Sequence, residues 1–97
     1  MNLNLNKLEK KIGIKFKNIK LLNKSLTHKS YDSTNNNEKL EFLGDRVLGL
    51  VISKKLLEIY PEDQEGVLDK KLASLVNKKR CVEVAKSLEL EKFILVG

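Results

Sequence analysis

Apolar residues recur at intervals of three and four along almost the whole chain, and no stretch alternates strictly between apolar and polar residues. Intervals of three and four are typical of helices with one buried face, whereas half-buried strands need strict alternation. The pattern therefore predicts an all-α fold of about five helices. The expected helices cover residues 5–12, 19–26, 38–60, 68–76 and 78–88. Gly13 is expected to cap the first helix, and Pro61 to end the third.

Length and composition place the chain among globular proteins. Its 97 residues make one domain or less, and 41% hydrophobic with 33% charged residues is not a disordered composition. No apolar run approaches the roughly 20 residues that span a bilayer, and no apolar signal segment opens the sequence, so we expect a cytoplasmic protein without a membrane partner. The single cysteine, Cys81, excludes an internal disulfide and is expected to be a small buried residue.

The net charge of +6 favours a polyanionic partner such as nucleic acid. For any single lysine, however, an ordinary solvated surface is the simpler interpretation. The chain has no Trp and only five Phe and Tyr residues, so a surface that stacks single-stranded bases is not expected. A helical DNA-binding protein would suit the charge, but no recognition helix is recognisable.

Three carboxylates share one face of the expected helix 38–60. Glu38, Glu41 and Asp45 are spaced by three and four residues, which stacks their side chains. After Asp45 the helix is apolar nearly all round, so it is predicted to be central and buried, with the acids where burial begins. The face opposite the acids is expected to lie in the core and carries Leu40, Leu43, Val47, Leu50 and Val51.

Glu41 and Asp45 are the candidate ligands of a hard divalent cation, because Mg²⁺ binds one or two carboxylates together with water and substrate phosphate. The alternative is a pair of solvent-facing acids that form ion pairs with neighbouring lysines along the helix. Spacing alone leaves both interpretations open.

Residues 38–46 read Glu-Lys-Leu-Glu-Phe-Leu-Gly-Asp-Arg, which closely resembles the nine-residue motif of the ribonuclease III family. Residues 26–30 resemble the family segment before this motif. Tyr60-Pro61 and Glu65-Gly66 resemble the segment after it, so the resemblance covers about residues 5–97. It implies the N-terminal part of the helical ribonuclease III endonuclease domain.

The resemblance also implies roles for individual residues. Glu41 matches a metal ligand, and Asp45 matches a catalytic carboxylate of the same metal cluster. Glu38 and Glu65 match acids that line the cleavage site. Phe42 matches an aromatic residue that inserts into the partner subunit of a homodimer, although a core position within its own subunit is the alternative.

The implied activity is hydrolysis of phosphodiester bonds in double-stranded RNA by Mg²⁺-activated water, in the processing of ribosomal RNA and other precursors. Mn²⁺ is expected to substitute for Mg²⁺, and no organic cofactor is expected. The single histidine, His28, has no nucleophile or second ligand nearby in the sequence, so it is expected to make a hydrogen-bonded packing contact rather than to act in catalysis.

The chain departs from the family pattern at one point. The family completes its metal site with an Asp and a Glu in a later run that resembles Asp-Thr-x-Glu-Ala, and this chain has no such run. It also has no separate double-stranded-RNA-binding domain. We therefore expect a truncated domain with weak or absent cleavage on its own. The alternative is a noncatalytic module that binds double-stranded RNA or dimerises through the same fold.

Overall fold

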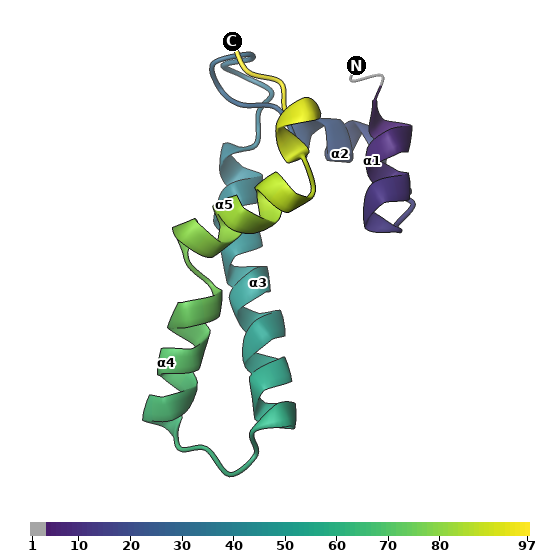
Figure 1. The fold of residues 1–97 in the computed structure, drawn as a ribbon. Coiled ribbons are helices and arrows are strands. Elements are labelled where there is room, and N and C mark those ends of the chain that lie inside the picture. Colours follow the sequence, from purple (N-terminus) through teal and green to yellow (C-terminus); the bar gives the residue numbers. More distant parts are fainter. Residues whose placement is uncertain (1–3) are drawn as a thin grey trace.

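The computed structural model describes residues 4–97, which form five α-helices and no strand beyond a single bridge (Figure 1). The predicted all-α fold is therefore confirmed. The helices are α1 (Leu5–Ile12), α2 (Ile19–Ser25), α3 (Glu38–Ile59), α4 (Glu65–Leu75) and α5 (Lys78–Ser87), followed by a 3₁₀ turn at Leu90–Lys92. None of the described helices is both long enough and apolar enough to cross a membrane.

Local sequence signals explain most of the helix ends. Gly13 adopts a left-handed conformation with φ of 73°, and its N–H donates to the Glu9 carbonyl, as expected for a glycine cap. Helix α3 stops at Ile59, directly before Tyr60 and Pro61. Helix α4 begins at Glu65, earlier than predicted, because Glu65 and Gly66 add nothing to the apolar periodicity.

One small core joins the two ends of the chain. It contains Leu5 and Leu8 of α1, Leu22 of α2 and Phe93 from the C-terminal segment, each less than a tenth exposed. The segment around Leu95 is held by backbone hydrogen bonds that pair it with residues 26–28 in a parallel bridge. The first two helices and the last residues therefore form one packed unit beside the upper end of α3 (Figure 1).

The prediction that α3 is buried all round is wrong for this chain. Helix α4 runs antiparallel along one side of α3 (Figure 1), and Leu56 is the buried residue of α3. The face expected to lie in the core is largely exposed, with Leu50 at 71%, and exposed Leu43, Val47 and Val51 beside it. Within residues 4–97 this face is partly covered at Leu40, which lines a hollow with Leu21 and Leu22 of α2. Cys81, expected to be buried, is also exposed.

Candidate functional site

Hydrogen bonds to the preceding segment fix the start of α3. The Asn37 N–H donates to the Thr27 carbonyl at 2.9 Å, and the Asn37 side-chain amide donates to the Ser25 carbonyl at 3.2 Å. The Asn36 side-chain oxygen accepts the Glu38 N–H at 3.1 Å and satisfies one of the free donors of the first turn. The end of α2 therefore sets the position of the acidic turn of α3.

The loop that leads into α3 is ordered by an aspartate. The Asp32 carboxylate accepts the backbone N–H groups of Thr34 and Asn35 at 3.0 and 2.9 Å. The Asn35 bond, and then the Thr34 bond, lower the pKa of Asp32 below its usual value, because both stabilise the charged form. This polar loop therefore has a defined conformation at neutral pH.

Glu41 and Asp45 lie one turn apart near the N-terminal end of α3, and both are exposed. Within residues 4–97 neither side chain forms an ion pair or a side-chain hydrogen bond. The structure therefore contradicts the alternative in which lysines of the same chain form ion pairs with these acids. Both carboxylates have all their oxygen atoms available for other ligands.

The acidic row continues into the packed side of α3. Leu48 is still 38% exposed, Ile52 is half-buried, and Leu56 is buried. Glu41 and Asp45 therefore stand at the exposed end of a row that becomes buried at Leu56, but Ile59, further along the same row, is 54% exposed. A helix anchored in this way holds the two carboxylates on a rigid element.

Glu38 begins the acidic row and has one weak partner. Its carboxylate lies 3.5 Å from the Lys29 ammonium, and both side chains are more than half exposed. Such a surface pair contributes at most about 1 kcal/mol, so it does not remove Glu38 from use by a ligand. The sequence did not predict Lys29 as the partner, because the pair joins a loop to a helix start.

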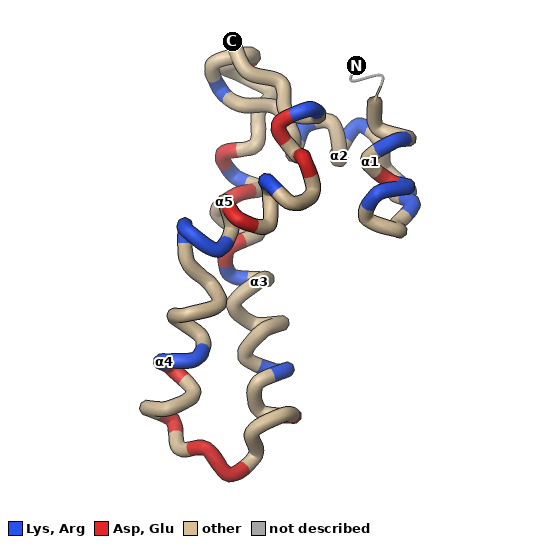
Figure 2. The backbone as a smooth tube through the Cα atoms, in the orientation of Figure 1, with Lys and Arg blue, Asp and Glu red and all other residues tan. Residues whose placement is uncertain are grey.

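Glu65 lies far from the other candidate acids of the same chain. It opens α4, next to the end of α3 that is remote from Glu41 and Asp45 (Figures 1 and 2). At 1.5 Å per residue, the axis of α3 separates Asp45 from that end by about 20 Å. The structure therefore brings Glu38, Glu41 and Asp45 together and does not bring Glu65 to them.

Phe42 projects from α3 with 62% of its surface exposed, so it is not part of the core that residues 4–97 form. The Arg46 guanidinium lies over its ring, 3.7 Å from the ring centre, and one Arg46 nitrogen donates to the Phe42 carbonyl at 2.9 Å. The spacing of four residues was the available sequence signal for this cation–π pair. Phe42 is thus held in one orientation on an open surface.

His28 has the hydrogen-bonded role that the sequence predicts, but at an exposed position. Its Nδ1 accepts the Ser30 N–H at 3.1 Å and lies 2.7 Å from the Ser30 hydroxyl oxygen. Its backbone N–H donates to the Leu95 carbonyl at 2.9 Å. These contacts tie the loop to the C-terminal segment.

The donor set suits a hard cation in part. Mg²⁺ in proteins takes one or two carboxylates and fills its remaining positions with water and phosphate, which matches an exposed Glu41 and Asp45 pair. Within residues 4–97, however, no group of three or more His, Cys, Asp or Glu residues is placed to hold a metal ion. The arrangement can therefore supply two ligands of a cation that also binds an incoming phosphate.

Known proteins match this chain over most of its length. It is 70% identical to ribonuclease 3 of Pelagibacter ubique over 99% of the chain and 43% of that protein. It is 48% identical to ribonuclease 3 of a Nitratiruptor species over 96% of the chain and 41% of that protein. The chain thus spans about two-fifths of the length of these curated relatives.

A solved structure has the same fold. The nuclease domain of ribonuclease III from Campylobacter jejuni superposes with a TM-score of 0.93 at 47% identity, covering 97% of this chain and 66% of that one. That domain is described as flexible in a region involved in dimer formation. The sequence model of ribonuclease-III-like proteins matches residues 18–97. The chain therefore belongs to the ribonuclease-III-like family.

Proposed function

We propose that the full-length protein is an endoribonuclease that hydrolyses phosphodiester bonds of double-stranded RNA, and that Glu41 and Asp45 are two of its metal ligands. The observation that carries this proposal is the unpaired carboxylate pair on α3, inside the nine-residue motif of the family. Mg²⁺, with Mn²⁺ as a substitute, would supply charge neutralisation and activation of the attacking water when bound there.

The residues of the chain have distinct roles in this proposal. Glu41 and Asp45 bind the cation and orient it toward the scissile phosphate. Glu38, on the same face and only loosely paired with Lys29, lies beside them and positions the RNA or the water. Glu65 lines the cleavage site only if another part of the assembly brings it there, because within one chain it lies at the far end of α3.

A homodimer belongs to the same proposal. It is supported by the exposed Phe42, which Arg46 holds in place, and by the dimer-forming region of the Campylobacter jejuni domain. Cytoplasmic action on ribosomal RNA and other precursors rests on the family resemblance. Duplex RNA suits a site of this kind because its wide minor groove exposes phosphates and 2′-hydroxyls rather than readable base edges.

The test uses the full-length protein and a labelled RNA duplex with and without Mg²⁺. Glu41→Gln and Asp45→Asn should each reduce the cleavage rate by at least about a hundredfold while changing the duplex affinity little, because they remove ligands and not phosphate contacts. Glu58→Gln is the matched control, since Glu58 is an exposed acid of the same helix that pairs with Lys54. It should cleave like the wild type.

Two results would contradict the proposal. Cleavage that persists in both ligand variants would remove Glu41 and Asp45 from the metal site. Tight duplex binding by the wild-type protein with no cleavage in Mg²⁺ or Mn²⁺ would favour the noncatalytic RNA-binding module.

A further inference from the structure

The excess of positive over negative charge in this chain lies in its first third. Residues 1–31 contain eight of the 19 basic residues and only one of the 13 acidic residues. The remaining 66 residues contain 11 basic and 12 acidic residues, so they are close to neutral. A general bias toward lysine would act along the whole sequence and would not exclude acids from one segment. The net charge of +6 is therefore a property of α1, α2 and the loop between them.

The one acid in this segment is withdrawn from the surface. Glu9 is only 8% exposed, and its Oε2 accepts the backbone N–H of Phe16 at 2.7 Å. This bond spans the loop after α1, and the left-handed Gly13 begins the same loop. Glu9 therefore fixes the loop conformation and leaves no freely exposed carboxylate among the lysines.

Six lysines of this segment have no acidic partner within residues 4–97. They project from α1, from the following loop and from α2, and we call them the lysine surface: Lys7, Lys10, Lys15, Lys17, Lys20 and Lys24. In the rest of the chain the basic residues are mixed with a similar number of acids, and Lys54, Lys71 and Arg80 each pair with one. Unpaired ammonium groups repel one another, so a bound anion would stabilise this segment.

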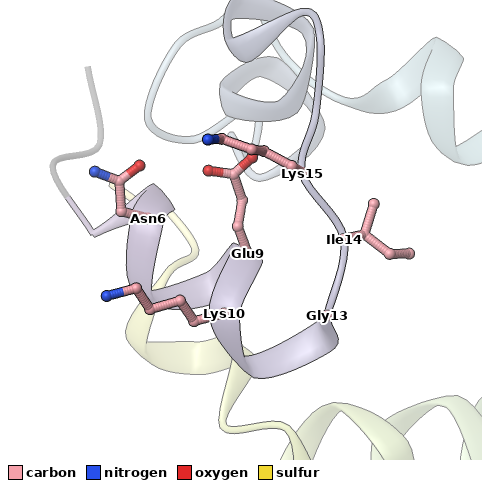
Figure 3. Close-up of a pocket in the computed structure, with 6 residues that line it drawn as sticks. All are labelled: Asn6, Glu9, Lys10, Gly13, Ile14 and Lys15. Atoms are coloured by element: carbon pink, nitrogen blue, oxygen red, sulfur yellow. The ribbon is translucent and has the colours of Figure 1, made fainter.

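Two of these lysines flank a hollow. Figure 3 shows Lys15 from the loop beside the Glu9 carboxylate, and Lys10 from α1 further along the helix and directed away from that carboxylate. The hollow has a volume of about 540 Å³, and Asn6, Gly13 and Ile14 complete its lining. Glu9 and Gly13 fix the conformation of the loop after α1. Lys10 and Lys15 therefore extend toward a ligand from a backbone of defined conformation.

The lysine surface lies at the same end of the molecule as the acidic turn of α3. Figure 2 shows α1 and α2, with their basic residues, at the upper end of the molecule where α3 begins, and an acidic loop around residues 62–65 at the opposite end. A duplex whose scissile phosphate reaches Glu41 and Asp45 therefore lies at the end of the molecule that carries the basic helices, away from the acidic loop. Its backbone is attracted toward α1 and α2.

We propose that the lysine surface binds the phosphate backbone of the RNA duplex next to the cleavage site. It thereby sets the orientation of the duplex relative to Glu41 and Asp45. This inference rests on the proposed function. Lysine suits the role because a flexible point charge neutralises phosphates without reading sequence. Each phosphate contact releases counterions and steepens the salt dependence of binding.

The test compares two fourfold variants of the full-length protein that lose the same charge. The first changes Lys10, Lys15, Lys17 and Lys20 to Gln. The control changes Lys54, Lys55, Lys70 and Lys86 to Gln, on α3, α4 and α5. Affinity for a blunt-ended RNA duplex is measured in EDTA, without cleavage, over a range of KCl concentrations.

The first variant should flatten the plot of log affinity against log salt by about 0.9 for each lost phosphate contact, thus by about 3 to 4 in total. The control should change the slope by less than about 1. The corresponding Lys→Arg variant should bind like the wild type, because the positive charge is kept.

Two outcomes would overturn the inference. The first is an unchanged slope in the variant of Lys10, Lys15, Lys17 and Lys20. The second is an equal decrease of the slope in both fourfold variants, which would reflect net charge alone. Absence of duplex binding by the wild-type protein would instead contradict the proposed function.

Discussion

Leu21 and Leu22 are neighbours on α2 but differ in burial, which makes them a matched pair for testing the core. Leu22 is 7% exposed and packs with Leu5, Leu8 and Phe93, whereas Leu21 is 48% exposed. Leu22→Ala loses the transfer free energy of a buried leucine and leaves a cavity, so we expect a loss of about 3 kcal/mol. Leu21→Ala loses about half of the transfer term and leaves no cavity, so we expect about 1 kcal/mol.

Urea unfolding of the full-length protein, followed by helical circular dichroism, measures both losses. Both substitutions lie on one short helix and change its helix propensity equally, so their difference reports burial alone. With a slope of about 1 to 3 kcal/mol per molar urea, the loss expected for Leu22→Ala moves the midpoint by at least about 1 M. Equal midpoints for the two variants would refute the claim that α1, α2 and the C-terminal segment share one core.

Two further predictions concern the backbone and pH. Gly13→Ala should destabilise the protein by about 1 to 2 kcal/mol in thermal unfolding because its φ of 73° disfavours a side chain, whereas the control Gly66→Ala, in a helix, should not destabilise it; equal effects would contradict the left-handed cap. The pKa of Glu89 is lowered by Lys92 and then by Lys11, so the stability that Glu89 adds is present above its usual value of 4.5 and is lost as pH falls through the lowered pKa. The stability difference between wild type and Glu89→Gln should therefore shrink as pH is lowered below about 4.5, and a difference independent of pH would contradict this ion pair.

The fold was predictable where local signals decide it. Apolar spacing predicted the helices, and Gly13 and Pro61 predicted two helix ends, but the first turn of α4 and the 3₁₀ turn at Leu90–Lys92 were missed. The environment of α3 was not predictable. An apolar residue indicates a surface that favours burial, but it does not indicate which element or which chain buries that surface. The sequence correctly predicted an apolar face around Leu50, but the prediction that this face is buried was wrong for this chain.

The candidate site was predictable to a similar extent. Spacing along one helix was enough to place Glu38, Glu41 and Asp45 on one face, because helix geometry fixes side chains three and four residues apart. The distance from Glu65 to these acids depends on how α4 packs against α3, which no local pattern encodes. The Lys29 contact to Glu38 was missed for the same reason, since it joins separate elements.

Binding of Mn²⁺ to the full-length protein, mapped by paramagnetic broadening of backbone amide signals, tests most directly whether Glu41 and Asp45 hold the catalytic metal. We predict the strongest broadening at residues 41–45, and its loss in Asp45→Asn. Broadening centred on the acidic loop at residues 62–65, or broadening that is unchanged in Asp45→Asn, would contradict the account.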